Sequence, residues 1–105
     1  MDRTIFANLR NTLATLYPDE RSIRRIADDS GIDLSHIILN AHAKNDWHAV
    51  LTEANKNNQV GALLTAVEGE YSGNKQLGNI CQEYRVWQNK NGEAISGSSV
   101  LVNEK

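Results

Sequence analysis

The chain has 105 residues, of which 40% are hydrophobic and 23% are charged, as is typical of one soluble globular domain with a modest core. The sequence has no apolar run near the roughly 20 residues that span a bilayer, and its N-terminus does not resemble a secretory signal. The net charge of −2 argues against binding to nucleic acid. The single cysteine excludes an internal disulfide. Together with the missing membrane span and secretory signal, it favours a cytoplasmic protein with no membrane partner.

Charge is unevenly distributed along the chain. Residues 1–27 hold five arginines and three acids, whereas the remainder holds six basic and ten acidic residues. A small domain with one basic part and one acidic part can attract copies of itself head to tail. A mixed, well-solvated surface accounts for the same distribution without any partner.

Two amphipathic helices are predicted for the first third of the chain. Apolar residues recur at helical spacing over residues 3–16, and Pro18 ends that pattern. Asp19 can cap a second helix over residues 20–30, and Gly31 can stop it. The residues expected to face the core are Ile5, Leu9, Leu13 and Leu16 in the first helix and Ile23, Ile26 and Ala27 in the second.

Four shorter helices are predicted to follow. Asp33 can cap a third helix over residues 33–40, and Asn45 or Asp46 can start a fourth. Later helices are expected over about residues 59–71 and 75–84. The apolar residues expected to face inward are Leu34, Ile37 and Ile38, then Trp47, Val50, Leu51 and Ala54, then Val60, Leu63, Leu64, Val67 and Tyr71, and finally Leu77, Ile80, Cys81 and Tyr84. The sequence therefore predicts an all-α fold, a compact antiparallel bundle of about six short helices over residues 1–84.

The C-terminal segment, residues 85–105, differs in character from the rest. Asn91-Gly92, between "RVWQ" and "EAIS", is a strong hairpin signal, and "SGSS" is typical of flexible linkers. We predict a mostly irregular linker or tail that forms at most a weak hairpin, or that lies on the bundle through Val86 and Trp87.

All three histidines, His36, His42 and His48, fall within 13 residues and raise the question of a metal site. Residues six apart are rotated by about 120° around a helix, whereas zinc-binding histidines on one helix are spaced by three or four. No H-E-x-x-H pattern is present. We therefore predict no metal and no other cofactor, and interpret these side chains as partly exposed histidines around a helix boundary.

Catalytic signals are missing from the sequence. Cys81 falls on the apolar stripe of its helix, which has no histidine, as expected of a small buried hydrophobe. Trp47 shares a stripe with Val50 and Leu51, which favours a core role over ligand stacking. The sequence has no glycine-rich phosphate loop, no G-x-S-x-G and no C-x-x-C, so we predict no catalytic residues and no enzyme.

The second helix carries the densest group of charges: Arg21, Arg24, Arg25, Asp28 and Asp29. Arg24–Asp28 and Arg25–Asp29 stand at i,i+4 and can pair, although exposed pairs contribute only about 0.3–0.5 kcal/mol each. The same residues can instead form a protein-docking surface, with donors on one flank and acceptors on the other. Both interpretations stay open. The two aspartates oppose a phosphate-binding role for the arginines.

The ordered series of motifs resembles the first type of effector-associated domain, found in bacterial conflict and signalling systems. The resemblance covers about residues 5–84. Its elements are the leucine-rich first helix ending in Leu16-Tyr17-Pro18-Asp19, the arginine-bearing second helix, Gly31-Ile32-Asp33, Asn45-Asp46-Trp47, Glu53-Ala54, and Tyr71 with Asn74 and Leu77.

This resemblance implies an all-helical adaptor similar to the death-fold interaction modules. Such domains recruit effectors, for example proteases, nucleotide-sensing or TIR-type enzymes, to regulatory NTPases by like-with-like binding. The expected partner is a matching effector-associated domain in the same or another protein, including a second copy of this one. The alternative hypothesis is a small regulatory helical domain that binds a ligand or a metal.

Overall fold

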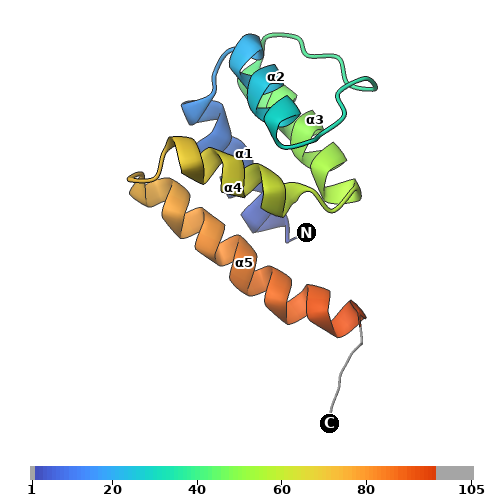
Figure 1. Cartoon of the computed structure of the whole chain (residues 1–105), viewed down its shortest axis with the longest axis vertical. Coiled ribbons are helices and arrows are strands. Elements are labelled where there is room, and N and C mark those ends of the chain that lie inside the picture. Colours follow the sequence, from blue (N-terminus) through green and yellow to red (C-terminus); the bar gives the residue numbers. More distant parts are fainter. Residues whose placement is uncertain (1, 97–105) are drawn as a thin grey trace.

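The computed structural model describes residues 2–96, and within them the side chains of residues 2–90 (Figure 1). This part of the chain forms five helices: α1 (Arg3–Leu16), α2 (Glu20–Asp29), α3 (Ala43–Lys56), α4 (Val60–Glu70) and α5 (Lys75–Ser96). The predicted all-α class is confirmed, with five helices in place of about six. No helix among the described residues is both long enough and apolar enough to cross a membrane.

The first two helices begin and end where the sequence predicts. Asp2 caps α1 because its carboxylate accepts hydrogen bonds from the backbone N–H groups of Thr4 and Ile5. Asp19 caps α2 by accepting the Ser22 N–H at 3.0 Å. Gly31 follows α2 with a φ of 81°, a left-handed conformation that glycine adopts without steric cost. These caps fix the position of α2 along the chain.

The core contains most of the predicted inward-facing residues, whereas Ile5, Leu16, Leu34 and Ile37 are only partly buried against it. Trp47 is fully buried, with 0% of its surface exposed, and its indole N–H donates to the Tyr17 carbonyl at 3.1 Å. The other fully or nearly fully buried apolar residues are Leu9, Leu13, Tyr17, Ile23, Ile26, Ala27, Ile32, Leu39, Val50, Leu51, Ala54, Val60, Leu63, Leu64, Val67, Leu77, Ile80, Cys81 and Tyr84. Burial of Trp47 and Cys81 confirms the structural roles that the sequence predicts for both.

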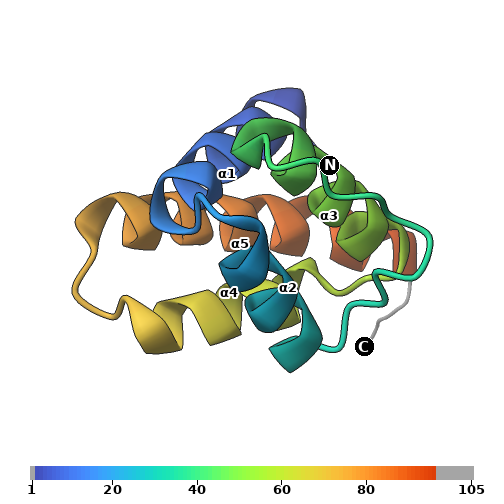
Figure 2. The ribbon, with the colours of Figure 1, turned by 90° about the horizontal axis from the view of Figure 1, so that it is seen from above.

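Each helix touches two or three others, and α2 touches α3 and α4. Figure 2 shows α4 and α5 diverging from the short turn that joins them, with α2 lying across α4. One face of α2 packs on the core through Ile23, Ile26 and Ala27. The opposite face of α2 therefore points away from the bundle.

The predicted third helix is wrong. Residues 32–42 form an irregular connection in which Ile38 is 90% exposed and Leu39 is buried instead. Asp33 caps only a single turn, by accepting the Ser35 N–H. The buried carboxylate of Asp46 accepts the Asn40 N–H at 2.9 Å, which holds the end of this connection against α3.

The predicted start of the next helix is also wrong. α3 begins at Ala43, and His42 occupies the N-cap position without a side-chain cap bond. Asn45 and Asp46 lie inside the first turns of α3. Asp46 is buried because it binds the preceding connection, and it does not cap the helix.

The predicted hairpin at Asn91-Gly92 is wrong as well. α5 runs without interruption across residues 84 and 85 and through this pair to Ser96. Tyr84 and Trp87, one turn apart, have ring centroids 6.1 Å apart and extend the aromatic side of the helix beyond residue 84. Residues 97–105, which contain most of "SGSS", lie outside the described residues, and where the domain ends stays a prediction.

Candidate protein-interaction surface

The predicted docking residues Arg21, Arg24, Arg25, Asp28 and Asp29 form a single exposed charged surface, which we call the α2 face. It lies opposite the buried Ile23, Ile26 and Ala27. Part of it borders a shallow hollow beside the connection that follows α2. The hollow is lined by Arg21, Arg24, Arg25, Asp28, Ile32, Asp33 and Leu34.

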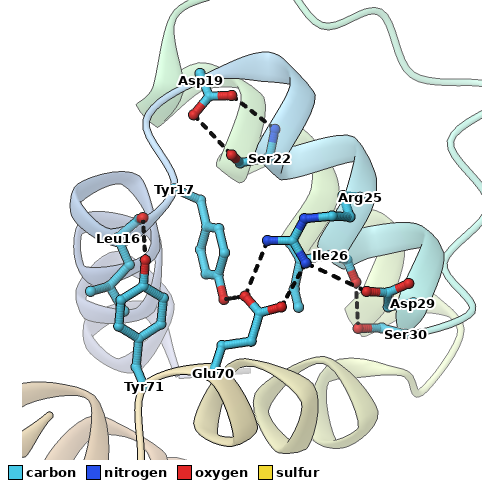
Figure 3. Close-up of polar contacts among 10 residues, drawn as sticks. All are labelled: Leu16, Tyr17, Asp19, Ser22, Arg25, Ile26, Asp29, Ser30, Glu70 and Tyr71. Atoms are coloured by element: carbon cyan, nitrogen blue, oxygen red, sulfur yellow. Dashed lines mark hydrogen bonds and ion pairs between the residues drawn. The ribbon is translucent and has the colours of Figure 1, made fainter.

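Arg25 differs from the other arginines of the α2 face because its guanidinium binds a distant residue of the same chain (Figure 3). Its guanidinium donates two hydrogen bonds to the Glu70 carboxylate at the end of α4, at 2.6 and 3.2 Å. The same carboxylate accepts the Tyr17 hydroxyl at 2.6 Å. We call Tyr17, Arg25 and Glu70 the Glu70 cluster. It joins the α1–α2 turn, α2 and α4 at one point.

Two ionisable groups of the Glu70 cluster are strongly perturbed. Hydrogen bonds from Arg25 and then from Tyr17 lower the pKa of the Glu70 carboxyl to about 2. Burial and the bond to Glu70 raise the pKa of the Tyr17 hydroxyl. The carboxylate is therefore ionised and the phenol is neutral at neutral pH. This arrangement orients α2 on α4, since a bidentate pair fixes direction as well as distance.

A second aromatic contact reinforces the same corner of the molecule. Tyr71, immediately after α4, packs edge-on against Tyr17 with ring centroids 5.5 Å apart. Its hydroxyl donates to the Leu16 carbonyl at the end of α1 (Figure 3). Tyr71 as a residue is 36% exposed, so its predicted inward orientation is met only in part.

The remaining charges of the α2 face are less constrained. Arg24 pairs with Glu20 at 2.9 Å instead of with Asp28, whereas the predicted Arg25–Asp29 pair is present at 3.6 Å. Within the described residues, the side chains of Arg21 and Asp28 form no hydrogen bond or ion pair. The α2 face therefore has two parts. Arg25 and Asp29 form the internally bound part, and Arg21, Arg24 and Asp28 form the solvent-facing part.

The family model of effector-associated domain 1 matches residues 1–85. The chain belongs to this family. No curated protein and no solved structure matches it. The matched residues contain all of α1 to α4, the first half of α5 and the entire α2 face. The resemblance inferred from the motifs is therefore confirmed over nearly the same residues.

The three histidines of this effector-associated domain lie in separate surroundings. His36 is in the connection after α2, His42 precedes α3, and the His48 ring stands edge-on to Phe6 at 5.2 Å. Among the described residues, no group of three or more His, Cys, Asp or Glu side chains is placed to hold a metal ion. Burial, with the Glu68 charge as a smaller cause, raises the pKa of the Cys81 thiol to about 11.

Sequence reasoning missed the Glu70 cluster. Arg25 and Glu70 are 45 residues apart, and Tyr17 and Glu70 are 53 apart. No local pattern relates residues at such separations. The only available signal was an acid at the end of the predicted fifth helix, where a negative charge is unfavourable next to the helix dipole and so calls for a partner.

Proposed function

We propose that this effector-associated domain is a non-enzymatic cytoplasmic adaptor. It couples effector and regulator proteins of a bacterial conflict or signalling system by associating with a matching effector-associated domain. The contact surface is the solvent-facing part of the α2 face, in which Arg21 and Arg24 supply donors and Asp28 supplies the acceptor.

The observation that supports this surface is the unequal use of charge on α2. Arg25 and Asp29 take part in intramolecular pairs, but Arg21 and Asp28 make none within the described part of the chain. The Arg24–Glu20 pair is exposed on both sides, at 51% and 40%. Such a pair contributes only a few tenths of a kcal/mol, so a partner carboxylate can replace Glu20 at little cost.

Mixed charge on one rigid helix also suits selective association. Opposed donors and acceptors set the register of two surfaces and repel those with the wrong order of charges. The Glu70 cluster holds α2 in a fixed orientation, so that less conformational freedom is lost when a partner binds. The family is not known for enzymatic activity, and this agrees with a role in association.

The test is the capture of a matching effector-associated domain 1 encoded in the same genome. We expect Arg21→Glu/Arg24→Glu to weaken this capture by at least about tenfold, because two favourable charge contacts become repulsive. The matched control is Lys44→Glu/Lys75→Glu, which changes the net charge equally at two exposed positions on α3 and α5. Circular dichroism should show unchanged helicity for both variants.

Arg25 is left unchanged in this experiment. Reversing Arg25 would break its bond to Glu70, so a loss of binding would not separate docking from packing. Equal capture by the α2 variant, the control and the unaltered chain would remove the α2 face as the contact surface. A loss shared by the control would show that only net charge matters.

A further inference from the structure

A stripe on the second half of α5 stands apart from the α2 face. Glu83, Val86, Trp87 and Lys90 lie at i, i+3, i+4 and i+7, which places them on one side of a helix. We call them the α5 stripe. They line a largely apolar groove together with Gln82 and with Asp2, Thr4 and Ile5 at the start of α1.

The groove exists because α5 is longer than the helices beside it. α1 begins next to the middle of α5, and Figure 1 shows α5 continuing past the N-terminus and away from the other helices. Val86 is consequently 50% exposed. An exposed apolar patch bordered by charges is typical of a contact site.

The side of α5 opposite the stripe packs on the bundle. Arg85 donates two hydrogen bonds to Glu68 of α4, at 2.6 and 3.2 Å. Cys81 and Tyr84 are buried in the core. On the stripe itself, Glu83, Val86 and Lys90 are exposed, whereas Trp87 is partly buried and packs beside Tyr84.

We propose that the α5 stripe binds a second copy of this chain, with the two α5 helices antiparallel about a two-fold axis between Val86 and Trp87. The order of charges along the stripe supports this arrangement. Glu83 and Lys90 lie equally far from that midpoint, about 5 Å along the axis on either side. In an antiparallel pair, Glu83 of each copy therefore faces Lys90 of the other.

The apolar centre of the stripe fits the same arrangement. Val86 of one copy meets the Trp87 ring of the other, and the two contacts are repeated by symmetry, as in an isologous interface. The Ile5 side chain at the groove wall adds apolar surface. A parallel pair would instead place Glu83 against Glu83 and Lys90 against Lys90, so the charges select the antiparallel direction.

This pairing is independent of the proposed function. Residues 86–90 lie beyond the residues that the family model matches, and no member of the α2 face belongs to the stripe. A dimer through α5 leaves both α2 faces exposed. One dimer would therefore present two docking surfaces to matching domains and raise their effective affinity.

The first experiment measures the solution mass of the full chain over a concentration series at low ionic strength. The unaltered chain should shift from monomer to dimer as its concentration rises. Glu83→Lys alone and Lys90→Glu alone should each raise the dimer dissociation constant by roughly tenfold or more, because two attractive contacts become repulsive. All these positions are exposed, so helicity should be unchanged.

Charge exchange supplies the matched controls. The double variant Glu83→Lys/Lys90→Glu restores both opposite-charge contacts and should dimerise like the unaltered chain. An equimolar mixture of the two single variants should form a mixed dimer, although neither variant dimerises well alone. Arg21→Glu/Arg24→Glu should dimerise normally, which separates this interface from the α2 face.

A disulfide test then locates the symmetry axis. Val86→Cys should form a covalent dimer on mild oxidation, because the axis passes next to this residue, whereas Thr52→Cys on exposed α3 surface should not. The proposal is overturned if the chain is monomeric at every concentration. It is also overturned if neither Glu83→Lys nor Lys90→Glu changes the dimer dissociation constant. A dimer that appears only when residues 97–105 are removed overturns it too, since the groove would then belong to the chain's own C-terminal residues.

Discussion

Replacing Trp47 by phenylalanine should destabilise the domain by about 2–5 kcal/mol. The indole N–H donates to the buried carbonyl of Tyr17 at 3.1 Å, and phenylalanine has no donor to replace it. A buried carbonyl that loses its partner costs about 1–3 kcal/mol. The smaller ring also leaves empty space at a site with 0% exposure, which contributes roughly another 1–2 kcal/mol.

Thermal unfolding followed by far-UV circular dichroism measures this loss. For a domain of this size, the expected change lowers the unfolding midpoint by about 10–25 °C. Thr52→Ala is the matched control on the exposed side of the same helix, and it should change stability by no more than about 0.5 kcal/mol. A Trp47→Phe midpoint that falls no further than that of the control would refute the assigned hydrogen bond and its packing.

Three further predictions follow from single residues. The pKa of Glu70 is lowered from 4.5 to about 2, so its contribution to stability is complete above about pH 4.5 and is lost as the pH falls toward 2. In urea unfolding measured at several pH values, Glu70→Gln should reduce this loss of unfolding free energy at acid pH. Because burial raises the pKa of Cys81 to about 11, its thiol should react with Ellman's reagent at pH 8 roughly a hundredfold more slowly in the folded chain than in urea, and equal rates would contradict its burial. Gly31→Ala should cost about 1 kcal/mol by chemical denaturation, because φ is 81° although a Cβ would meet only the Gln59 amide at 4.0 Å; an unchanged midpoint would mean that this conformation carries no strain.

Local signals were sufficient to predict the first two helices and most of the core. Asp19, Pro18 and Gly31 act within a few residues of themselves, so their effect on the backbone can be read directly from the sequence. The buried apolar residues repeat with a regular helical period. Caps and periodicity agreed in these segments, and the structure followed them.

The connection after α2 shows why such signals fail elsewhere. Leu34, Ile37 and Ile38 have helical spacing, but the chain buries Leu39 and exposes Ile38. A tertiary bond decides this result, because the Asp46 carboxylate holds the Asn40 N–H. The pattern of apolar residues contains no information about that bond.

The same limit applies at the end of α5 and on the α2 face. Asn91-Gly92 indicates a hairpin only when the flanking segments are strands, and here they continue a helix. On α2, the sequence grouped five charges together as equal candidates. Only the folded chain brings Glu70 to Arg25 and so separates a packing residue from those that remain exposed.

The position of Tyr17 has a consequence for synthesis of the protein on the ribosome. Tyr17 contacts Trp47 and Glu70, which follow it by 30 and 53 residues. A nascent chain that has exposed only its first two helices lacks both partners and has no means of orienting α2. Productive folding must therefore wait until α4 has left the exit tunnel, and until then the basic N-terminal helices are exposed to any chaperone that binds positively charged, partly apolar segments.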